Sequence, residues 1–421
     1  SSFSALNLST IATGSSAGFR ILGAAANDLS GSSVAPLGDV NGDGIDDIAI
    51  GAYNADPPAL SADSNGGITY VIFGRDVAHG APAFADIALI SIVSSSTIGF
   101  RILGAGVGDQ SGITVASAGD VNGDGINDIV IGSAFADPPA LPANSDAGAA
   151  YVIYGRNIAH GASAYGDILL STVVNSTIGF VINGAVSGGQ LGRSVCSAGD
   201  INGDGLDDII VPAYLTNSPM LGLGNYAGIV YVIFGRNTSI IAPTAMDIAV
   251  SSIVTGSSLG FRIIGAAAGD RIGRSCAPAG DVNGDGIADI IVGSINAFSS
   301  AGASYVIFGA PSFQDVLLST FSTPTSLGFR ILGAAAADGT GLSVSGAGDI
   351  NGDGIMDILV GGYQANPVTF PANSRVGITY VIFGRDVAHG APAFAALNVS
   401  VLHSGSTAGF RVLGPGVGAN S

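Results

Sequence analysis

A single phrase recurs along the chain and limits the folds that are open to it. Gly-Phe-[Arg/Val]-[Ile/Val] occurs six times, at intervals of 81, 80, 81, 68 and 81 residues, beginning at Gly18, Gly99, Gly179, Gly260, Gly328 and Gly409. A fixed period indicates one supersecondary unit that is repeated and that buries its apolar surface against its neighbours. The repeat therefore predicts one domain over residues 1–421, although the length alone would allow two or three.

Each unit contains the same segments in the same order. Gly18 to Gly23 is followed by a loop of the form G-D-[V/I]-N-G-D-G, by the apolar run Ile48 to Ile50, by Thr69 to Gly74 and by a D-I-x-L-like strand that leads to the next Gly-Phe phrase. These short β-branched and aromatic runs, bounded by Gly, Asp or Pro, are typical of strands. Four short strands in a repeated unit indicate a β-propeller blade. We expect an all-β propeller of four-stranded blades, with five blades or as part of a seven-bladed ring.

One Gly-Phe strand is left over when the chain is divided into repeat units. The predicted units are 18–98, 99–178, 179–259, 260–327 and 328–408, with partial units 1–17 and 409–421. The fourth unit is shorter between Ser294 and Ala303, which places the variation in a loop. Six Gly-Phe strands accompany five copies of every other strand, so either 18–23 or 409–414 is spare. A spare strand edge can be covered by another chain.

The composition excludes several classes of function. The chain has no Lys and no Glu, so its 13 basic residues are all Arg and its 31 acidic residues are all Asp. A formal net charge of −18 disfavours nucleic acid and anionic membranes as partners. No apolar run approaches the roughly 18 residues that span a bilayer. Without Lys, Glu or a recognisable nucleophile motif, we expect no enzyme.

The loop D-x-N-x-D-G-x-x-D supplies the strongest candidate site. Oxygen atoms at positions 1, 3, 5, 7 and 9 can surround a cation, and Gly at position 6 permits the sharp turn. Hard oxygen ligands without His or Cys favour Ca²⁺. We predict about five Ca²⁺ ions, which would reduce the formal charge to about −8. The candidate ligands are Asp39, Asn41, Asp43, Ile45, Asp47; Asp120, Asn122, Asp124, Ile126, Asp128; Asp200, Asn202, Asp204, Leu206, Asp208; Asp281, Asn283, Asp285, Ile287, Asp289; and Asp349, Asn351, Asp353, Ile355, Asp357.

The sequence allows two alternatives to this calcium loop. A helix-loop-helix calcium site would have Glu at position 12, whereas the chain has an apolar residue there, as at Ile50 and Val211. The loop is therefore expected at a tight connection between two strands. Simple β-turns could also be rich in Asp and Gly. Five copies that retain every ligand position favour the metal.

The order of these motifs resembles the FG-GAP repeat of integrin α-subunit propellers over essentially the whole chain. The phrases that carry the resemblance are G-F-x-[I/V]-x-G, G-D-[V/I]-N-G-D-G-x-x-D and Y-V-[I/V]-[F/Y]-G. The resemblance implies a propeller with its calcium hairpins on one face and an extracellular adhesive or structural role. The units differ from the family in length, since they are near 80 residues rather than about sixty, and in number.

Two non-catalytic functions follow as hypotheses. The first is a calcium-binding structural subunit of an extracellular fibre or surface assembly, with copies of itself as partners through 18–23 or 409–414. Identity of Gly67 to Ala85 with Gly377 to Ala395 over nineteen residues favours it. The second is an adhesion or recognition module that binds an extracellular protein or glycan through the propeller face. Identical repeats count against this alternative, because a specific site needs one blade to differ.

The remaining polar and cysteine positions carry weaker predictions. Cys196 and Cys276 are interpreted as two free core residues, because their one-residue offset places them on opposite faces of equivalent strands; a disulfide bond between them is the alternative. Three recurring His residues are interpreted as loop residues copied with the repeat, and the recurring Arg as a structural residue that pairs with Asp. Candidate glycosylation sites, weak support for secretion, are Asn7, Asn175, Asn237 and Asn398.

Overall fold

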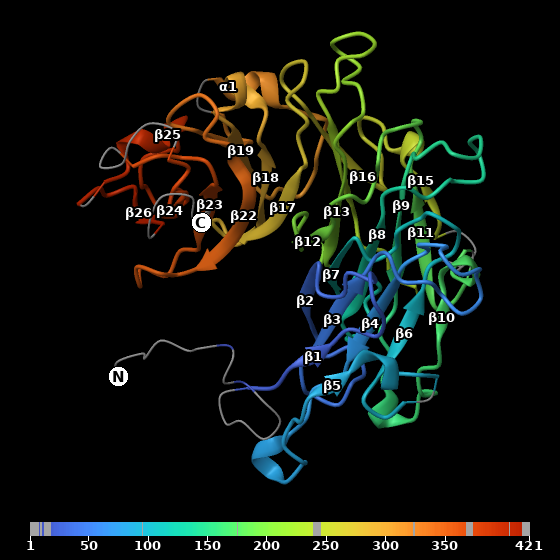
Figure 1. The fold of residues 1–421 in the computed structure, drawn as a ribbon. Coiled ribbons are helices and arrows are strands. Elements are labelled where there is room, and N and C mark those ends of the chain that lie inside the picture. Colours follow the sequence, from blue (N-terminus) through green and yellow to red (C-terminus); the bar gives the residue numbers. More distant parts are fainter. Residues whose placement is uncertain are drawn as a thin grey trace.

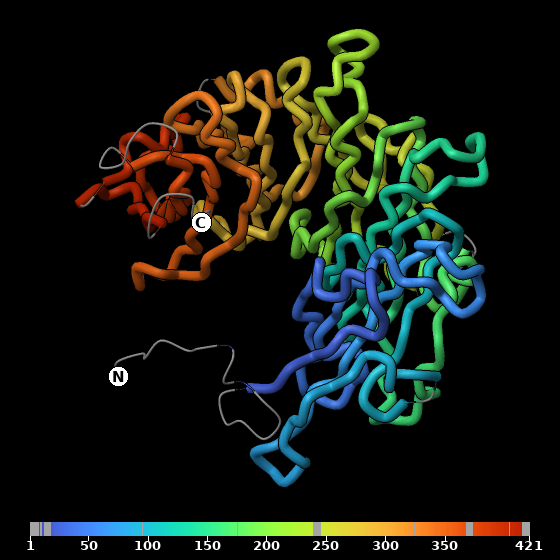
Figure 2. The backbone as a smooth tube through the Cα atoms, viewed as in Figure 1, coloured from blue at the N-terminus to red at the C-terminus, as the bar shows by residue number. Residues whose placement is uncertain are grey.

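The computed structural model confirms an all-β chain arranged as consecutive blades. It describes residues 8, 11, 18–94, 96–174, 176–238, 246–322, 325–367, 374–403 and 405–414. In this part, five sheets of four or five strands follow one another, with a separate pair formed by β1 (Ile21–Leu22) and β5 (Ile87–Ala88). Figure 1 shows the sheets along an arc from blue to red, and Figure 2 follows the backbone through the same path.

Each sheet is one blade, numbered 1 to 5 in chain order. Blade 1 consists of β2 (Ser33–Gly38), β3 (Asp47–Ala52), β4 (Ile68–Ile72), β6 (Gly99–Leu103) and β10 (Ile168–Leu169). Blade 2 consists of β7 (Thr114–Gly119), β8 (Asp128–Ser133), β9 (Ala149–Ile153), β11 (Gly179–Asn183) and β15 (Ile248–Ala249). Blade 3 consists of β12 (Cys196–Gly199), β13 (Asp208–Ala213), β14 (Ile229–Ile233), β16 (Gly260–Ile264) and β20 (Val316–Leu317). Blade 4 consists of β17 (Ser275–Gly280), β18 (Asp289–Ser294), β19 (Ala303–Ile307), β21 (Gly328–Leu332) and β25 (Leu397–Asn398), and blade 5 of β22 (Thr340–Gly348), β23 (Asp357–Gly362), β24 (Ile378–Ile382) and β26 (Gly409–Leu413).

Helical structure is confined to short segments between strands. The one α-helix of the described residues, α1 (Ala297–Ser300), replaces the long loop of the other units and explains the shorter fourth unit. Single turns of 3₁₀ helix follow the third strand or the short parallel strand of several blades: η2 (Val77–His79), η3 (Leu89–Ser91), η4 (Ile158–His160), η5 (Leu170–Thr172), η7 (Val250–Ser252), η8 (Leu318–Ser322) and η9 (Val399–Val401).

Each blade takes its outer strands from the units that follow it. In blade 1, β6 pairs antiparallel with β4, so that Ile72 lies opposite Gly99, and β10 then pairs parallel with β6. The Gly-Phe strand therefore completes the preceding blade, and β26 completes blade 5 against β24. The spare strand of the sequence is accordingly 18–23, whose residues Ile21 and Leu22 pair with β5. The D-I-x-L-like strand of the sequence forms a short fifth strand in blades 1 to 4, so these sheets have one strand more than the predicted four.

The apolar core lies between the blades. Val71 and Ile102 of blade 1 are buried in one cluster with Ile131 and Ile153 of blade 2. Equivalent clusters fill the next three interfaces. Consecutive blades contact each other through their first strands, and within the described residues no comparable contact joins β22 back to β2. The five blades thus form an open arc.

Stacked aromatic rings recur at the outer part of these interfaces. Phe100 of blade 1 stacks on Tyr165 with ring centroids 3.9 Å apart, and the Arg156 guanidinium lies 4.8 Å from the centroid of Tyr165. Phe329 stacks in the same way on Phe394 at 4.2 Å. Stacked rings and cation–π contacts add to the stabilisation from apolar burial. The Phe residues of the four inner Gly-Phe phrases are therefore core residues of blade interfaces: Phe100, Phe180, Phe261 and Phe329.

The structure corrects the interpretation of the two cysteines. Cys196 in β12 and Cys276 in β17 form a disulfide bond, with Cα atoms 6.3 Å apart. Their side chains do point to opposite faces of equivalent strands, as the sequence indicated. The strands belong to neighbouring blades, however, so opposite faces meet across the interface of blades 3 and 4. The one-residue offset is what brings the two sulfur atoms together.

We expect loss of this disulfide to destabilise the chain. The bond closes a loop with a sequence separation of 80 residues, which constrains the unfolded chain. Substitution of both cysteines by Ala should lower the free energy of unfolding by about 2–5 kcal/mol. Urea unfolding of the variant measures this loss, and reduced wild-type protein should behave like the variant. Coincident transitions of the oxidised and reduced wild type would contradict the prediction.

Candidate calcium-binding loops

Each candidate loop joins the first two strands of a blade, as the sequence predicted. In the first loop, the Asp39 carboxylate accepts hydrogen bonds from the backbone amides of Gly42 at 2.7 Å, Asp43 at 3.1 Å and Gly44 at 2.7 Å. Gly42 and Gly44 have φ values of 77° and 85°, a region that favours glycine. The loop therefore curls around the carboxylate at position 1.

The Asp at position 9 is buried at the start of the second strand. Asp47 is fully buried and accepts hydrogen bonds from the amides of Val40 at 3.1 Å and Gly74 at 2.8 Å. Burial raises the pKa of Asp47 to about 7, the two amides lower it, and the Asp43 and Asp39 carboxylates raise it further. Burial also raises the pKa of the equivalent Asp208 and Asp289 to about 8. A carboxylate in this position needs a positive neighbour to remain ionised at low cost.

The donors of the loops fit a divalent cation. Every side-chain donor is an oxygen, which suits Ca²⁺. In the second loop, Oδ1 of Asn122 at position 3 is buried and has no hydrogen-bond partner in the described structure, as expected for an atom that would bind an ion. The structure does not arrange three or more Asp, His or Cys side chains of the described residues as a metal centre. The carboxylates at positions 1 and 9 are instead turned toward backbone amides.

The loops also connect consecutive blades, which the sequence did not reveal. The Val40 carbonyl of the first loop accepts hydrogen bonds from the Arg156 amide at 3.0 Å and the Tyr165 hydroxyl at 2.8 Å. The Asn41 carbonyl accepts one from the Ile158 amide at 2.8 Å. These donors follow the third strand of blade 2. The recurring Arg-[Asp/Asn]-[Val/Ile]-Ala-His segment was the signal that could have indicated this contact.

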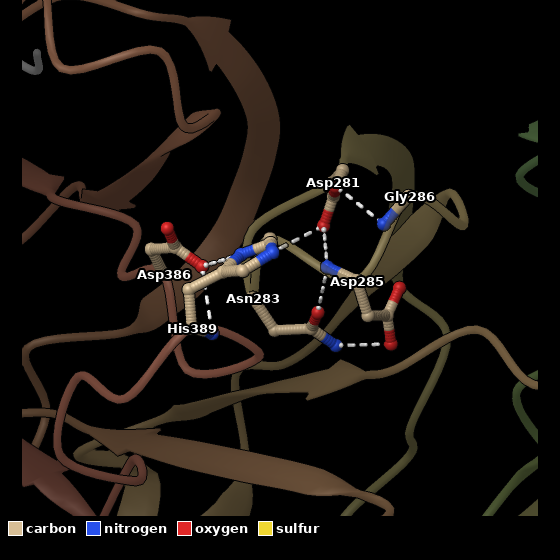
Figure 3. A network of polar contacts seen from close by, with 7 residues as sticks. Asp281, Asn283, Asp285, Gly286, Asp386 and His389 are labelled. Atoms are coloured by element: carbon tan, nitrogen blue, oxygen red, sulfur yellow. Dashed lines mark hydrogen bonds and ion pairs between the residues drawn. The ribbon is translucent and has the colours of Figure 1, made fainter.

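Figure 3 shows the same arrangement between blades 4 and 5. The Asp281 carboxylate accepts hydrogen bonds from backbone amides of its own loop. Asp386 and His389 lie beside that loop. The Asn283 carbonyl accepts a hydrogen bond from the Val387 amide at 2.8 Å. Nδ1 of His389 lies 2.7 Å from Oδ1 of Asp386, and the His389 side chain is 77% exposed. His79 and His160 form the same local pair, with Asp76 and Asn157.

The recurring Arg residues are structural where their partners are described. Arg101 forms an ion pair with Asp167, with Nε–Oδ1 and Nη2–Oδ2 distances of 3.0 and 2.5 Å. Arg262 pairs with Asp315 at 3.0 and 2.5 Å, and Arg20 pairs with Asp86. The Arg101 and Arg262 pairs join the fourth and fifth strands of blades 1 and 3, and the Arg20 pair joins β1 and β5 in the same way. The predicted pairing of Arg with Asp is therefore confirmed for these three.

The candidate glycosylation sites remain predictions. Asn7 and Asn175 lie outside the described residues. Asn237 and Asn398 are half-buried, and Oδ1 of Asn398 accepts a hydrogen bond from the Ser400 amide at 2.9 Å. Of the described residues, none forms a helix with the length and apolar character needed to cross a bilayer.

Comparison with known proteins identifies the repeat. The family model for the FG-GAP repeat matches residues 30–72, 111–153, 191–233, 273–307 and 340–382, which contain the first three strands of each blade. The chain is 28% identical to integrin alpha pat-2 of Caenorhabditis briggsae over 277 residues, covering 61% of this chain and 18% of the relative. It is 28% identical to integrin alpha ina-1 of Caenorhabditis elegans over 189 residues, covering 44% and 16%. Human integrin alpha-11 is 30% identical over 218 residues, covering 49% and 16%.

These matches define the class of protein. The chain belongs to the FG-GAP repeat family of integrin α-type β-propellers. The part of these three relatives that it matches is less than a fifth of their length.

We expect Ala substitutions at two equivalent glycines to measure how closely blade 5 packs against the fourth calcium loop. Gly284 and Gly352 hold position 4 of the fourth and fifth loops, and both have φ of 78°. A Cβ atom on Gly284 would lie 2.8 Å from Oδ1 and 3.0 Å from Cα of Asp386, whereas a Cβ on Gly352 would meet nothing within 4 Å. Gly352→Ala should cost about 1–2 kcal/mol from its backbone conformation. Gly284→Ala should cost about 1–3 kcal/mol more, because Asp386 must move.

Denaturant unfolding of the two variants measures the difference directly. The backbone strain is common to both, so the difference reports only the contact with blade 5. Equal losses of stability would show that the contact is not maintained in solution.

Proposed function

We propose that the chain is an extracellular calcium-binding propeller segment that assembles with further copies of itself through blade 5. The observation that carries the proposal is the exposed far face of this blade. Ile350 and Val412 are 47% and 51% exposed, whereas the equivalent Val40 and Ile102 of blade 1 are fully buried against blade 2. Such an apolar sheet face normally packs against another blade.

Among the described residues, the aromatic stack of blade 5 has no third member. Phe383 and Phe410 lie 6.0 Å apart and tilted, as Phe73 and Phe100 do in blade 1. In blade 1 the ring of Tyr165 completes the group by stacking on Phe100. Near the other end of the arc, Phe84 holds this third place and stacks on Phe19 at 4.4 Å. A second copy can therefore supply Phe84 to Phe410.

The two strands that would exchange are nearly identical. Gly18 to Gly23 reads GFRILG and Gly409 to Gly414 reads GFRVLG. Within the described part of the chain, β1 pairs with β5 alone, whereas β26 pairs with β24 along five residues. β26 of one copy, which is held by five residue pairs with β24, would replace β1 as the pairing partner of β5 in the next copy. This replacement would cover the face of blade 5 and the fifth calcium loop, whose residues 348–354 are exposed.

Calcium would stabilise the blades and their contacts. Each loop places acidic side chains next to carbonyls that accept hydrogen bonds from the following blade. An ion in the loop would therefore stabilise both the loop and its contact with that blade. A disulfide bond and the likeness to integrin α chains support an extracellular location. An adhesive role that recognises a protein or glycan is the second candidate, favoured by the integrin likeness. Either role is one of binding rather than of catalysis.

We expect calcium to stabilise the chain site by site. For a dissociation constant near 10⁻³ M, 10 mM calcium should add about 1.4 kcal/mol per loop to the free energy of unfolding. Asp43→Asn should remove one site of about five, measured by calorimetric titration and by melting in calcium and in EDTA. Asp46→Asn is the matched control, because it makes the same charge change at position 8, which is not a ligand position. Equal melting of the wild type in calcium and EDTA would contradict calcium binding.

We expect assembly to depend on Phe410. Light scattering of the purified chain in millimolar calcium should show large species, and Phe410→Asp should leave monomers. Phe19→Asp should preserve assembly, because β26 replaces the strand that carries Phe19. A compact wild-type monomer in calcium would contradict self-assembly and would favour the recognition role.

A further inference from the structure

One position just before the first strand of each blade has the same backbone throughout but a different side chain. The glycine that precedes this position has a φ value between 81° and 90° in all five blades. The residues that follow these glycines in blades 1 to 5 are Ser32, Ile113, Arg193, Arg274 and Leu342. Blades 3 and 4 therefore each carry an Arg that the repeat itself does not require.

This position lines one cavity in four consecutive blades. The cavity has a volume of about 600 Å³, within the range of ligand pockets, and its lining includes Ser32, Ile113, Arg193 and Arg274. These residues meet because β2 contacts β7, β7 contacts β12, and β12 contacts β17. Figure 1 shows these first strands along the inner side of the arc. The cavity therefore belongs to the stack of blades, and no single blade could form it.

The chain itself does not neutralise the two arginines of the cavity. Within the described residues, neither Arg193 nor Arg274 forms an ion pair, and the cavity lining contains no Asp. Arg20, Arg101 and Arg262, in contrast, each bind an Asp. In a chain with a formal net charge of −18, two half-buried guanidinium groups without a carboxylate partner form a local site for an anion.

Side-chain amides also line the cavity. In the third unit, Oε1 of Gln190 accepts a hydrogen bond from the Tyr214 hydroxyl at 2.9 Å. The second unit has Ala134 in the place of this Tyr, so the equivalent Gln110 has no such partner and lines the cavity instead. Asn54 supplies a second amide. Amide groups both donate and accept hydrogen bonds, which suits a ligand rich in hydroxyl groups.

Two aromatic side chains complete the lining. Tyr53 and Phe135 follow β3 and β8, and both are half-buried. An aromatic face offers apolar surface to the C–H groups of a ring that packs on it, and Tyr adds a hydroxyl group. The cavity thus combines cations, amides and aromatic rings.

We propose that this cavity binds an acidic sugar residue of an extracellular polysaccharide. Arg193 and Arg274 would bind its carboxylate or sulfate group, because a guanidinium donates two parallel hydrogen bonds to such an oxyanion. Gln110 and Asn54 would bind its hydroxyl groups, and Tyr53 would pack against its ring. A carboxylate side chain of a protein would use the two arginines and leave the amides and the aromatic rings without a partner.

Such a site would serve the recognition role given above as the second candidate, on which this inference rests. Its lining comes from blades 1 to 4, whereas self-assembly would use the far face of blade 5. The monomeric Phe410→Asp variant should therefore bind the sugar with the affinity of the wild type. Loss of sugar binding in this variant would place the site at the joint between copies and would overturn the assignment.

The test uses three trisaccharides as probes: galacturonic acid, sulfated galactose and neutral galactose. Calorimetric titration of the full chain in millimolar calcium should show saturable binding of an acidic trisaccharide, and the tighter of the two identifies the acidic group. The neutral trisaccharide and a blocked Gly-Asp-Gly peptide should each bind at least tenfold more weakly. No saturable binding of either acidic trisaccharide, or equal binding of the neutral one or of the peptide, would overturn the proposal.

Variants of the chain locate the site. Arg193→Leu and Arg274→Leu should each weaken binding of the acidic trisaccharide at least tenfold. Both should fold, because Leu342 holds the equivalent position in blade 5. Arg375→Leu is the matched control, since it makes the same change in charge at an exposed residue outside the cavity and should bind as the wild type. Unchanged binding in both cavity variants would show that the cavity is not the site.

Discussion

Each blade of this protein has two apolar faces and can bury them only against its neighbours. Ile102 and Val71 of blade 1 are fully buried because blade 2 covers them. The corresponding face of blade 5 has no such cover among the described residues, and Val412 is half exposed there. The outer strands of each blade come from the unit that follows it. These shared strands link consecutive blades, as the same constraint requires. Packing between blades, rather than within one blade, is therefore what the stability of the fold depends on.

The sequence predicted the strands and the loops well because their signals are local. Runs such as Ile48 to Ile50 and turns such as Asp39 to Asp47 are set by residue preferences within a few positions. Three features were not predicted, because they join segments far apart in the chain: the blade to which each Gly-Phe strand belongs, the parallel pairing of the short fifth strand, and the hydrogen bonds of Val40. The disulfide shows the reason most clearly. Alternation along a strand gave the correct directions of Cys196 and Cys276, but the sequence alone did not show that the two faces meet.

The acidic residues of the loops connect the electrostatics to this packing. Asp47 is fully buried, with Asp43 and Asp39 close enough to raise its pKa further, so the folded state accumulates like charges at the first loop. Backbone amides offset part of this cost. The carbonyls of the same loops bind the next blade at Val40 and Asn41. A change in the charge of a loop would therefore change the stability of the interface between two blades. For this reason, cations in the loops are expected to stabilise the whole arc.

Repetition and specificity place opposite demands on such a chain. Identical blades stack well but offer no single place that a partner could distinguish. The alternation of side chains along β11 resolves this conflict, because its two faces can vary separately. Phe180 and Ile182 retain the contact with blade 3, so the arc continues through blade 2 without interruption. Val181 and Asn183, which replace the Arg and the aliphatic residue of the other blades, lie on the other face, where both line a cavity and Val181 still packs in the cluster between blades 1 and 2. A propeller blade can thus acquire a distinct surface by two substitutions while it keeps its place in the stack.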